Sequence, residues 1–280
     1  NQFCSYCIIP YARGRVRSRN IKNVLEEITK LSDKGFKEVV LTGIHLSSYG
    51  VDTGENLLHL IQEVHKIEGI KRIRLGSLEP RVITEEFASE LSKLPKICPH
   101  FHLSLQSGCD ATLARMNRKY TSKEYEDGCI RLRKYFKHPA ITTDIIVGFP
   151  GEDAKEFALS KEFARRIHFY EMHIFKYSKR QGTRAAVMEN QVPEEIKTKR
   201  SSELIELGEQ MSKEFRDYYI DSVQEVLFEE ESQIGGANYY VGYTREYLKV
   251  ATKSEKNLEN ELVSGRITGH LTNDVYLMEC

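Results

Sequence analysis

Long apolar runs, net charge and cysteines are all scarce in this chain. No apolar run in its 280 residues approaches the ~18 residues that a membrane-spanning helix requires. The N-terminus also lacks the charged and then apolar order of a secretory signal peptide. These absences exclude a membrane-spanning protein, and we expect a cytoplasmic location with no membrane partner.

Cysteines number only 6, and apart from the first two their spacing is irregular: Cys4, Cys7, Cys98, Cys109, Cys129 and Cys280. A small secreted disulfide scaffold would have a denser and more regular pattern. We interpret Cys98, Cys129 and Cys280 as small apolar residues in buried or edge positions.

Cys4 and Cys7 form a CxxC motif, which is compatible with half of a zinc site, a redox dithiol or two ligands of an iron–sulfur cluster. A redox dithiol begins a helix, whereas Ile8, Ile9 and Pro10 follow here, so we disfavour it. The further candidate zinc ligands are Cys98, His100 and His102. We expect these three to be scattered over two faces of a strand, which disfavours zinc.

The formal net charge is zero, so no overall positive field indicates a nucleic-acid partner. Cations are nevertheless clustered in two segments, Arg13, Arg15, Arg17, Arg19 and Lys22 in the first and Arg115, Arg118 and Lys119 in the second. Each cluster alone is explained by a solvated surface. Two clusters beside functional loops favour contacts with phosphate groups.

Helices and strands alternate over the first two thirds of the chain. Short apolar runs predict five strands, at 38–41, 72–75, 100–105, 141–147 and 170–175. Amphipathic helices are predicted at 20–34, 56–67, 84–91, 122–135 and 153–166. This alternation is typical of an α/β fold with a parallel sheet. Five strands are too few for a closed eight-stranded barrel, so we expect a partial parallel (β/α) barrel.

The C-terminal part has a different pattern. A long charged helix is predicted from Pro193 to about Ile220, and short β-type runs separated by glycines and polar turns follow it. These runs predict a small antiparallel β-barrel. We place the boundary near Arg216, which gives domains of residues 1–215 and 216–280.

Polar residues and glycines occupy the loops after the predicted strands. They include Gly43, His45, Ser77, Glu79, Gln106, Asp144 and Gly148. In parallel α/β barrels these loops converge on one face and carry the ligands. Each residue alone also has a structural explanation, such as a turn for a glycine, but together they indicate a functional rim.

Seven motifs follow one another along the chain: CSYC, IIPYARGRVRSR, VVLTGIH, RLGSLEP, HLSLQSGCDATLARMNRKYT, TDIIVGFPGE and HIFKYSKRQGTRAA. This series resembles the radical S-adenosylmethionine (radical SAM) methylthiotransferases over essentially the whole chain. The motifs GIH, SLEP and QSGCD are similar to those of the tRNA enzymes in that family that act on threonylcarbamoyladenosine. The C-terminal part resembles the TRAM domain, an RNA-binding β-barrel.

The resemblance has one departure. The family motif is CxxxCxxC, and its first cysteine would fall just before Asn1. The first barrel strand and an N-terminal domain that holds a second cluster would also precede Asn1. We therefore expect the chain to be a fragment of a longer protein.

The resemblance implies that Cys4 and Cys7 are metal ligands of a 4Fe-4S cluster whose open iron binds S-adenosylmethionine. It implies cofactor-binding roles for Tyr6, Gly43, Ser77, Glu79, Gln106 and Gly148. It implies RNA-binding roles for Arg13, Arg15, Arg17, Arg118 and Lys119. Tyr239, Tyr240, Tyr243 and Arg245 would add RNA contacts from the final barrel, although packing within strands is the favoured explanation for the three tyrosines. No side chain is given a catalytic role.

The resulting hypothesis is a tRNA methylthiotransferase that adds a methylthio group to C2 of threonylcarbamoyladenosine beside the anticodon. Its partners would be the tRNA anticodon stem-loop, an electron donor and a sulfur source. Alternatives are a sister enzyme that acts on isopentenyladenosine in tRNA or on an aspartate of a ribosomal protein. An alternative of another class is a non-catalytic, zinc-stabilised RNA-binding module.

Overall fold

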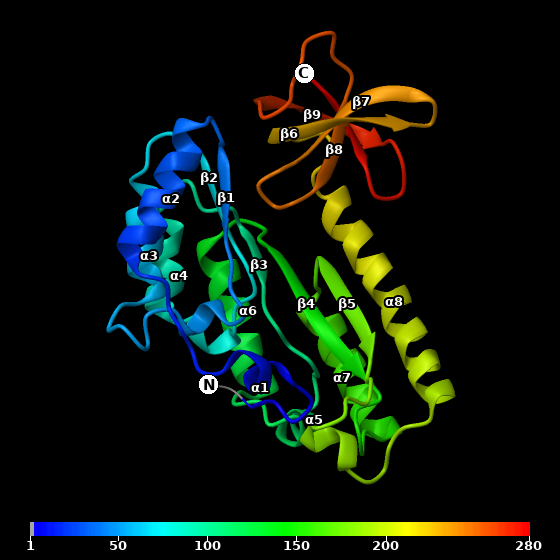
Figure 1. Cartoon of the computed structure of the whole chain (residues 1–280). Helices are drawn as coiled ribbons and strands as arrows, with labels where there is room; N and C mark the ends of the chain where they lie inside the picture. The colour runs from blue at the N-terminus through cyan, green and yellow to red at the C-terminus, as the bar shows by residue number, and fades with distance from the viewer. Residues whose placement is uncertain (1–2) are drawn as a thin grey trace.

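A computed structural model describes residues 3–280 of the chain, and Figure 1 shows two parts joined by a long helix. The first part contains the strands β1 (Glu38–Leu41), β2 (Arg72–Leu75), β3 (His100–His102), β4 (Ala140–Val147) and β5 (Glu171–Lys176). Its helices are α1 (Ile9–Arg13), α2 (Ile21–Asp33), α3 (Leu57–His65), α4 (Glu85–Ser92), α5 (Asp110–Arg115), α6 (Ser122–Tyr135) and α7 (Ala154–Ile167). The connecting helix is α8 (Glu194–Asp217).

The five strands of the first part are parallel, as predicted. β1 pairs with β2, and β3, β4 and β5 form a second sheet in that order. Single bridges between Ile73 and Ile97 and between Leu78 and Leu103 link the two sheets. Within residues 3–280, β1 and β5 do not pair with each other, so the barrel is partial.

Local sequence explains where several helices begin. Thr121 accepts a hydrogen bond from the Glu124 amide, and the Glu124 carboxylate accepts one from the Thr121 amide, which forms a capping box for α6. Asn20 caps α2 in a similar way through the Lys22 amide. The apolar faces of these helices cover a core that includes Ile61, Ile73 and Phe101.

The third strand is shorter than the predicted 100–105. β3 ends at His102, because the Leu105 amide donates to the Thr143 hydroxyl at 3.0 Å instead of to a backbone carbonyl. Gln106 then has a φ of 69°, an uncommon value for a residue with a side chain. Gln106 nevertheless pairs once more with β4, through a single bridge to Ile145 in which its amide donates to the Asp144 carbonyl oxygen at 2.8 Å. The chain leaves the sheet after this residue.

The second part is a closed barrel of the strands β6 (Val223–Ile234), β7 (Ala237–Tyr243), β8 (Lys249–Thr252), β9 (Leu262–His270) and β10 (Tyr276–Glu279). Gly242 allows two strands to approach closely, since a Cβ there would lie 2.1 Å from the Leu227 carbonyl oxygen. The prediction of a purely antiparallel barrel needs correction, because β10 runs parallel to β8. The other four pairings are antiparallel.

The barrel packs against the starting ends of the parallel strands, while α1 and the first described residues lie at the opposite end (Figure 1). Arg72, which is 1% exposed, donates to the carbonyl oxygens of Tyr243 and Glu225 at 2.8 and 2.6 Å. Arg74 donates to the Arg245 carbonyl oxygen at 3.0 Å. In residues 3–280, no helix combines the length and the apolar character needed to cross a membrane.

Candidate functional site

The CxxC loop is fixed to the rest of the domain by the residue between its cysteines. Ser5 is 2% exposed, and its hydroxyl donates to the Arg115 carbonyl oxygen at 2.8 Å. Its amide donates to the Met116 carbonyl oxygen, and its own carbonyl accepts from the Ala185 amide. These contacts hold Cys4 and Cys7 in one tight turn, in which the Cys7 amide donates to the Cys4 carbonyl at 3.1 Å. Both thiols remain partly exposed.

Arg118 lies directly beside this turn. Its guanidinium is 3.1 Å from the Cys4 sulfur, donates to the Tyr120 hydroxyl at 2.9 Å and lies 3.8 Å from the Glu79 carboxylate. The side chain is only 8% exposed. This position differs from that of a surface arginine that contacts phosphate groups. A buried guanidinium beside a thiol instead stabilises negative charge on that sulfur.

Tyr6, the second residue between the cysteines, joins the CxxC loop to two other loops. Its hydroxyl donates to the Gln106 side chain at 3.1 Å, and its ring contacts Phe149 edge to face at 6.1 Å. Phe149 in turn contacts Tyr177 in the same way. Burial raises the pKa of the Tyr6 hydroxyl, so it remains a neutral hydrogen-bond donor.

The loop GFPGE is held by α8. The Gly148 amide donates to the Glu152 carboxylate at 2.9 Å, and Arg200 on α8 donates to the same carboxylate at 2.6 Å. Gly148 has a φ of +70°, and a Cβ there would lie 2.4 Å from the Lys197 side chain. Only glycine fits this position without strain.

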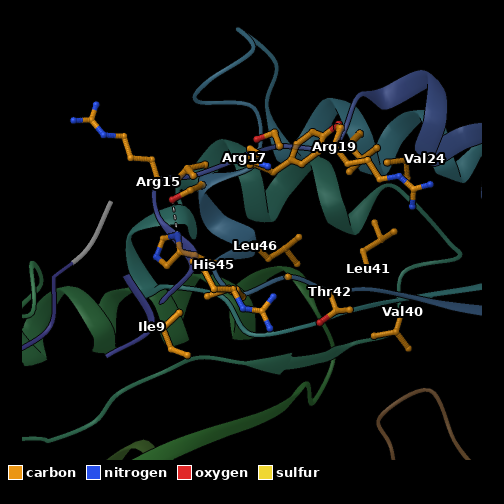
Figure 2. A pocket seen from close by; sticks show the side chains of 18 of the residues that line it. Ile9, Arg15, Arg17, Arg19, Val24, Val40, Leu41, Thr42, His45 and Leu46 are labelled. Carbon is orange, nitrogen blue, oxygen red and sulfur yellow. Dashed lines mark hydrogen bonds between the residues drawn. The ribbon is translucent and has the colours of Figure 1, made fainter. Parts of the chain in front are cut away.

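A cavity of about 1060 Å³ opens beside the CxxC loop. Eight of the predicted site residues line it: Cys4, Tyr6, Cys7, Arg13, Arg15, Arg17, Gly43 and Arg118. Figure 2 shows Arg15, Arg17 and Arg19 in succession along one wall and His45, Thr42 and Val40 along the facing wall.

The other predicted site residues lie outside the cavity lining. Glu79 and Gln106 are buried and reach the site through contacts with Arg118 and Tyr6. Ser77 is exposed, and Lys119 is exposed and donates to the Asn117 side chain. Gly148 approaches Glu152 and Lys197, as described above.

The cavity is rich in positive charge. The carboxylates that line it, Glu27 and Glu38, are paired with Arg19 and Arg74. Among residues 3–280, Arg13, Arg15 and Arg17 have no ion-pair partner, and all three are exposed. Three unpaired guanidinium groups near a thiol pair favour an anionic ligand.

Two groups of polar residues were given no role at the predicted site, although His45 and Asp144 belong to the predicted functional rim. His45 lies 3.3 Å from the Glu79 carboxylate and pairs with the Ser48 hydroxyl. His102, Asp144 and His173 form a second group on neighbouring strands. The predicted scattering of His100 and His102 over two faces is wrong, because residues two apart in a strand share a face. That spacing is the signal that could have identified the second group.

The donor set at Cys4 and Cys7 suits an iron–sulfur cluster. Both sulfurs lie on one turn beside a cavity, with a cation next to one of them, and thiolates are the usual protein ligands of such clusters. The third cysteine predicted just before Asn1 lies outside the described residues. Zinc with Cys98, His100 and His102 does not fit, because Cys98 is buried beside Arg74 and none of the three lines this cavity.

Comparison with known proteins defines the class. The Radical SAM superfamily profile matches residues 1–164. The chain therefore belongs to the radical SAM superfamily, whose cofactors are a 4Fe-4S cluster and S-adenosylmethionine.

The relatives carry more specific names. The chain is 42% identical over 270 residues to the threonylcarbamoyladenosine tRNA methylthiotransferase of Bacillus subtilis, an alignment of 95% of this chain and 60% of that protein. It is 40% identical over 269 residues to the tRNA-2-methylthio-N(6)-dimethylallyladenosine synthase of Acetivibrio thermocellus, covering 95% and 56%. The chain thus spans less than two thirds of the length of these relatives.

Solved structures agree on the fold. A radical S-adenosylmethionine methyltransferase from Kitasatospora setae, with cobalamin and a [4Fe-4S] cluster, matches with a TM-score of 0.56 and 17% identity, covering 66% of this chain and 36% of that one. Coproporphyrinogen III oxidase from Escherichia coli matches with a TM-score of 0.55 and 14% identity, covering 76% and 50%. The partial barrel is therefore that of radical SAM enzymes.

Proposed function

We propose that this protein is a tRNA methylthiotransferase that adds a methylthio group to C2 of threonylcarbamoyladenosine next to the anticodon. One observation carries the proposal: the fixed CxxC loop lies beside a cavity with unpaired arginines, in a chain that aligns over 95% of its length with tRNA methylthiotransferases. Its partners would be the tRNA anticodon stem-loop, an electron donor and a sulfur source. Its place of action would be the cytoplasm.

The charge of the cavity supports the choice of substrate. The threonylcarbamoyl group carries a free carboxylate, whereas a dimethylallyl group is a neutral hydrocarbon. Arg13, Arg15 and Arg17 line the cavity without ion-pair partners among the described residues. An anionic substituent would pair with these guanidinium groups, whereas a hydrocarbon would offer them no partner.

We expect the residues of the site to have different roles. Cys4 and Cys7 would hold two irons of the cluster, and Arg118 would stabilise the negative charge at Cys4. Tyr6 and Gln106 would shape one side of the S-adenosylmethionine site, with Gly43, Ser77, Glu79 and Gly148 on the neighbouring loops. When bound, the cluster and S-adenosylmethionine supply a carbon-centred radical. The exposed Arg13, Arg15, Arg17 and Lys119 would contact RNA.

The TRAM assignment of the C-terminal barrel is part of this proposal. The barrel is small, closed and β-rich, as that assignment requires. The RNA contact through Arg245 stays a prediction, and its guanidinium also donates to the Ile97 carbonyl oxygen at 2.6 Å in the contact between the two parts. Tyr240 and Lys253 line a smaller cavity on the barrel, together with the carboxylates of Glu231 and Glu255.

Deletion of the gene from its host tests the function. We expect digested tRNA from the deletion strain to lose the methylthio form of threonylcarbamoyladenosine and to retain the unmethylthiolated nucleoside, measured by liquid chromatography and mass spectrometry. A plasmid copy should restore the lost nucleoside, and a copy with Cys4→Ala should fail to do so.

The same measurement separates the alternatives. Loss of the methylthio-isopentenyl nucleoside, or of a methylthio group on a ribosomal protein, would contradict the proposal. Stoichiometric zinc without iron in the anaerobically reconstituted protein would instead support an RNA-binding module without catalysis.

A further inference from the structure

A group of polar side chains lies on the inner face of the partial barrel, outside the site described above. The His102 ring nitrogen is 3.2 Å from the Asp144 carboxylate, and its other nitrogen is 3.0 Å from the Thr142 hydroxyl. The His102 and His173 rings are stacked, with centroids 5.9 Å apart and planes at 27°. One ligand atom from each of His102, Asp144 and His173 lies within 4.8 Å of the others.

Strand register places an aromatic side chain next to this group. Asp144 is paired with His173, and Ile146 is paired with Phe175 two residues further along the same strands. Side chains two residues apart share a face, so Phe175 continues the surface toward the strand ends. Phe175 is 52% exposed, which is unusual for a phenylalanine in a strand.

This surface continues to the CxxC loop. Ile146 packs with the small apolar cluster that contains Phe149, and Tyr6 packs against the same cluster. A ligand on Phe175 and Asp144 would therefore lie within the barrel and near the turn that carries Cys4 and Cys7.

The chemistry of the surface selects a class of ligand. A phosphate would be repelled by the Asp144 carboxylate, and an aliphatic chain would cover Asp144 and His173 without offering either of them a hydrogen bond. A purine ring matches, because it offers a flat face for Phe175 and an edge with donors for the carboxylate and acceptors for imidazole N–H groups. Enzymes that modify a nucleobase take it out of the stack into such a pocket.

We propose that Asp144, His173 and Phe175 bind the purine ring of the target nucleotide, an inference that rests on the proposed function. Phe175 stacks on the ring, Asp144 accepts a hydrogen bond from its edge, and the exposed His173 imidazole donates to a ring nitrogen. His102, whose two ring nitrogens already face Asp144 and Thr142, orients the Asp144 carboxylate. The arginines of the cavity then bind other, anionic parts of the RNA. The arginine-lined cavity and the surface around Asp144 and Phe175 therefore recognise different features of one substrate.

The test compares two RNA stem-loops that differ only at the target position, one with threonylcarbamoyladenosine and one with an abasic site. The protein is reconstituted with iron and sulfide without oxygen, and binding is followed by fluorescence anisotropy of labelled RNA. We expect the wild type to bind the first RNA at least roughly tenfold more tightly than the abasic one. Phe175→Ala and Asp144→Asn should bind both RNAs with the affinity of the wild type for the abasic RNA.

Control variants and two further measurements make the result decisive. His59→Gln changes an exposed histidine on α3, paired with Glu55, and should keep the full preference. Thermal unfolding should show that each variant is folded, and equilibrium dialysis should show that each binds S-adenosylmethionine like the wild type.

Four outcomes would overturn the inference. The first is a preference that survives in both variants. The second is that the variants keep the preference for the modified RNA but lose S-adenosylmethionine binding. The third is that the wild type contains one equivalent of a divalent cation and that Asp144→Asn lacks it. If the wild type binds neither RNA, the proposed function fails as well, which separates that failure from the first three.

Discussion

At the scale of single residues, Arg118 shows how one buried cation organises the site. Its guanidinium contacts groups from three separate segments, the Cys4 sulfur, the Glu79 carboxylate and the Tyr120 hydroxyl. It also lies over the Tyr120 ring at 4.9 Å. A lysine would supply charge but not the fixed fork of donors that reaches several partners at once.

We predict that Arg118→Met lowers the free energy of unfolding by about 1–3 kcal/mol, because it leaves the buried Glu79 and Tyr120 polar groups without this partner. Lys119→Met is a matched control on the neighbouring exposed residue and should change stability by less than about 0.5 kcal/mol. Urea unfolding of the anaerobically purified proteins measures both. Equal stabilities for the two variants would show that the Arg118 contacts contribute nothing to folding.

At the scale of elements, α8 connects the C-terminal barrel to the cofactor loops. Arg200 and Lys197 on this helix contact Glu152 and the Tyr177 carbonyl oxygen, and both of these lie after strand ends. Glu152 is 5% and Arg200 is 7% exposed, so their ion pair is shielded from water. Burial raises the pKa of the Glu152 carboxyl, a shift that the Gly148 amide and Arg200 oppose.

We predict that Arg200→Met destabilises the protein by about 3–5 kcal/mol, since it leaves the Glu152 carboxylate buried and unpaired. The double variant with Glu152→Gln should recover part of that loss, because the remaining group is neutral. Lys199→Met, on the exposed face of the same helix, is the control. Chemical unfolding of the wild type, Arg200→Met, Glu152→Gln and the double variant forms a double-mutant cycle, and strictly additive effects would refute the coupling.

The elements were largely predictable, whereas their contacts were not. The apolar runs that became β1 and β2 have the predicted bounds, and β4 begins one residue earlier than predicted. The short helices α1 and α5 were missed because they lack an apolar periodicity. The contact of Arg118 with Cys4 joins residues 114 positions apart. Only the register of β4 and β5 brings Asp144 beside His173.

At the scale of the whole molecule, the barrel is fixed to the end of the domain opposite the CxxC loop. Arg72 and Arg74 donate to its backbone, and Lys37 pairs with Glu261 at 2.6 Å. His100, at the start of β3, lies 5.0 Å from the Tyr247 ring of the barrel and close to Arg74. An RNA that contacted both the barrel and the cavity would therefore extend along the length of the domain.

His100 makes this contact sensitive to pH. Burial first, and then Arg74, lower the pKa of His100 to about 3. Its Nδ1 atom is buried and, within residues 3–280, has no hydrogen-bond partner. The unfolded chain binds a proton at this histidine near pH 6.5, whereas the folded chain does so only near pH 3. The stabilisation of the folded state that comes from a neutral, buried His100 is thus complete above pH 6.5 and is lost as the pH falls toward 3.

We predict that the free energy of unfolding of the wild type falls below pH 6.5 with a contribution from His100 of at most about 1.4 kcal/mol per pH unit. His100→Gln removes this proton uptake, so its stability should fall less steeply between pH 6.5 and 4. His59→Gln, which changes an exposed histidine, should follow the wild type. Urea unfolding at half-unit intervals of pH gives the three curves. If the curves of His100→Gln and the wild type run parallel, His100 is not held neutral between the two parts of the molecule, and another group causes the loss of stability in acid.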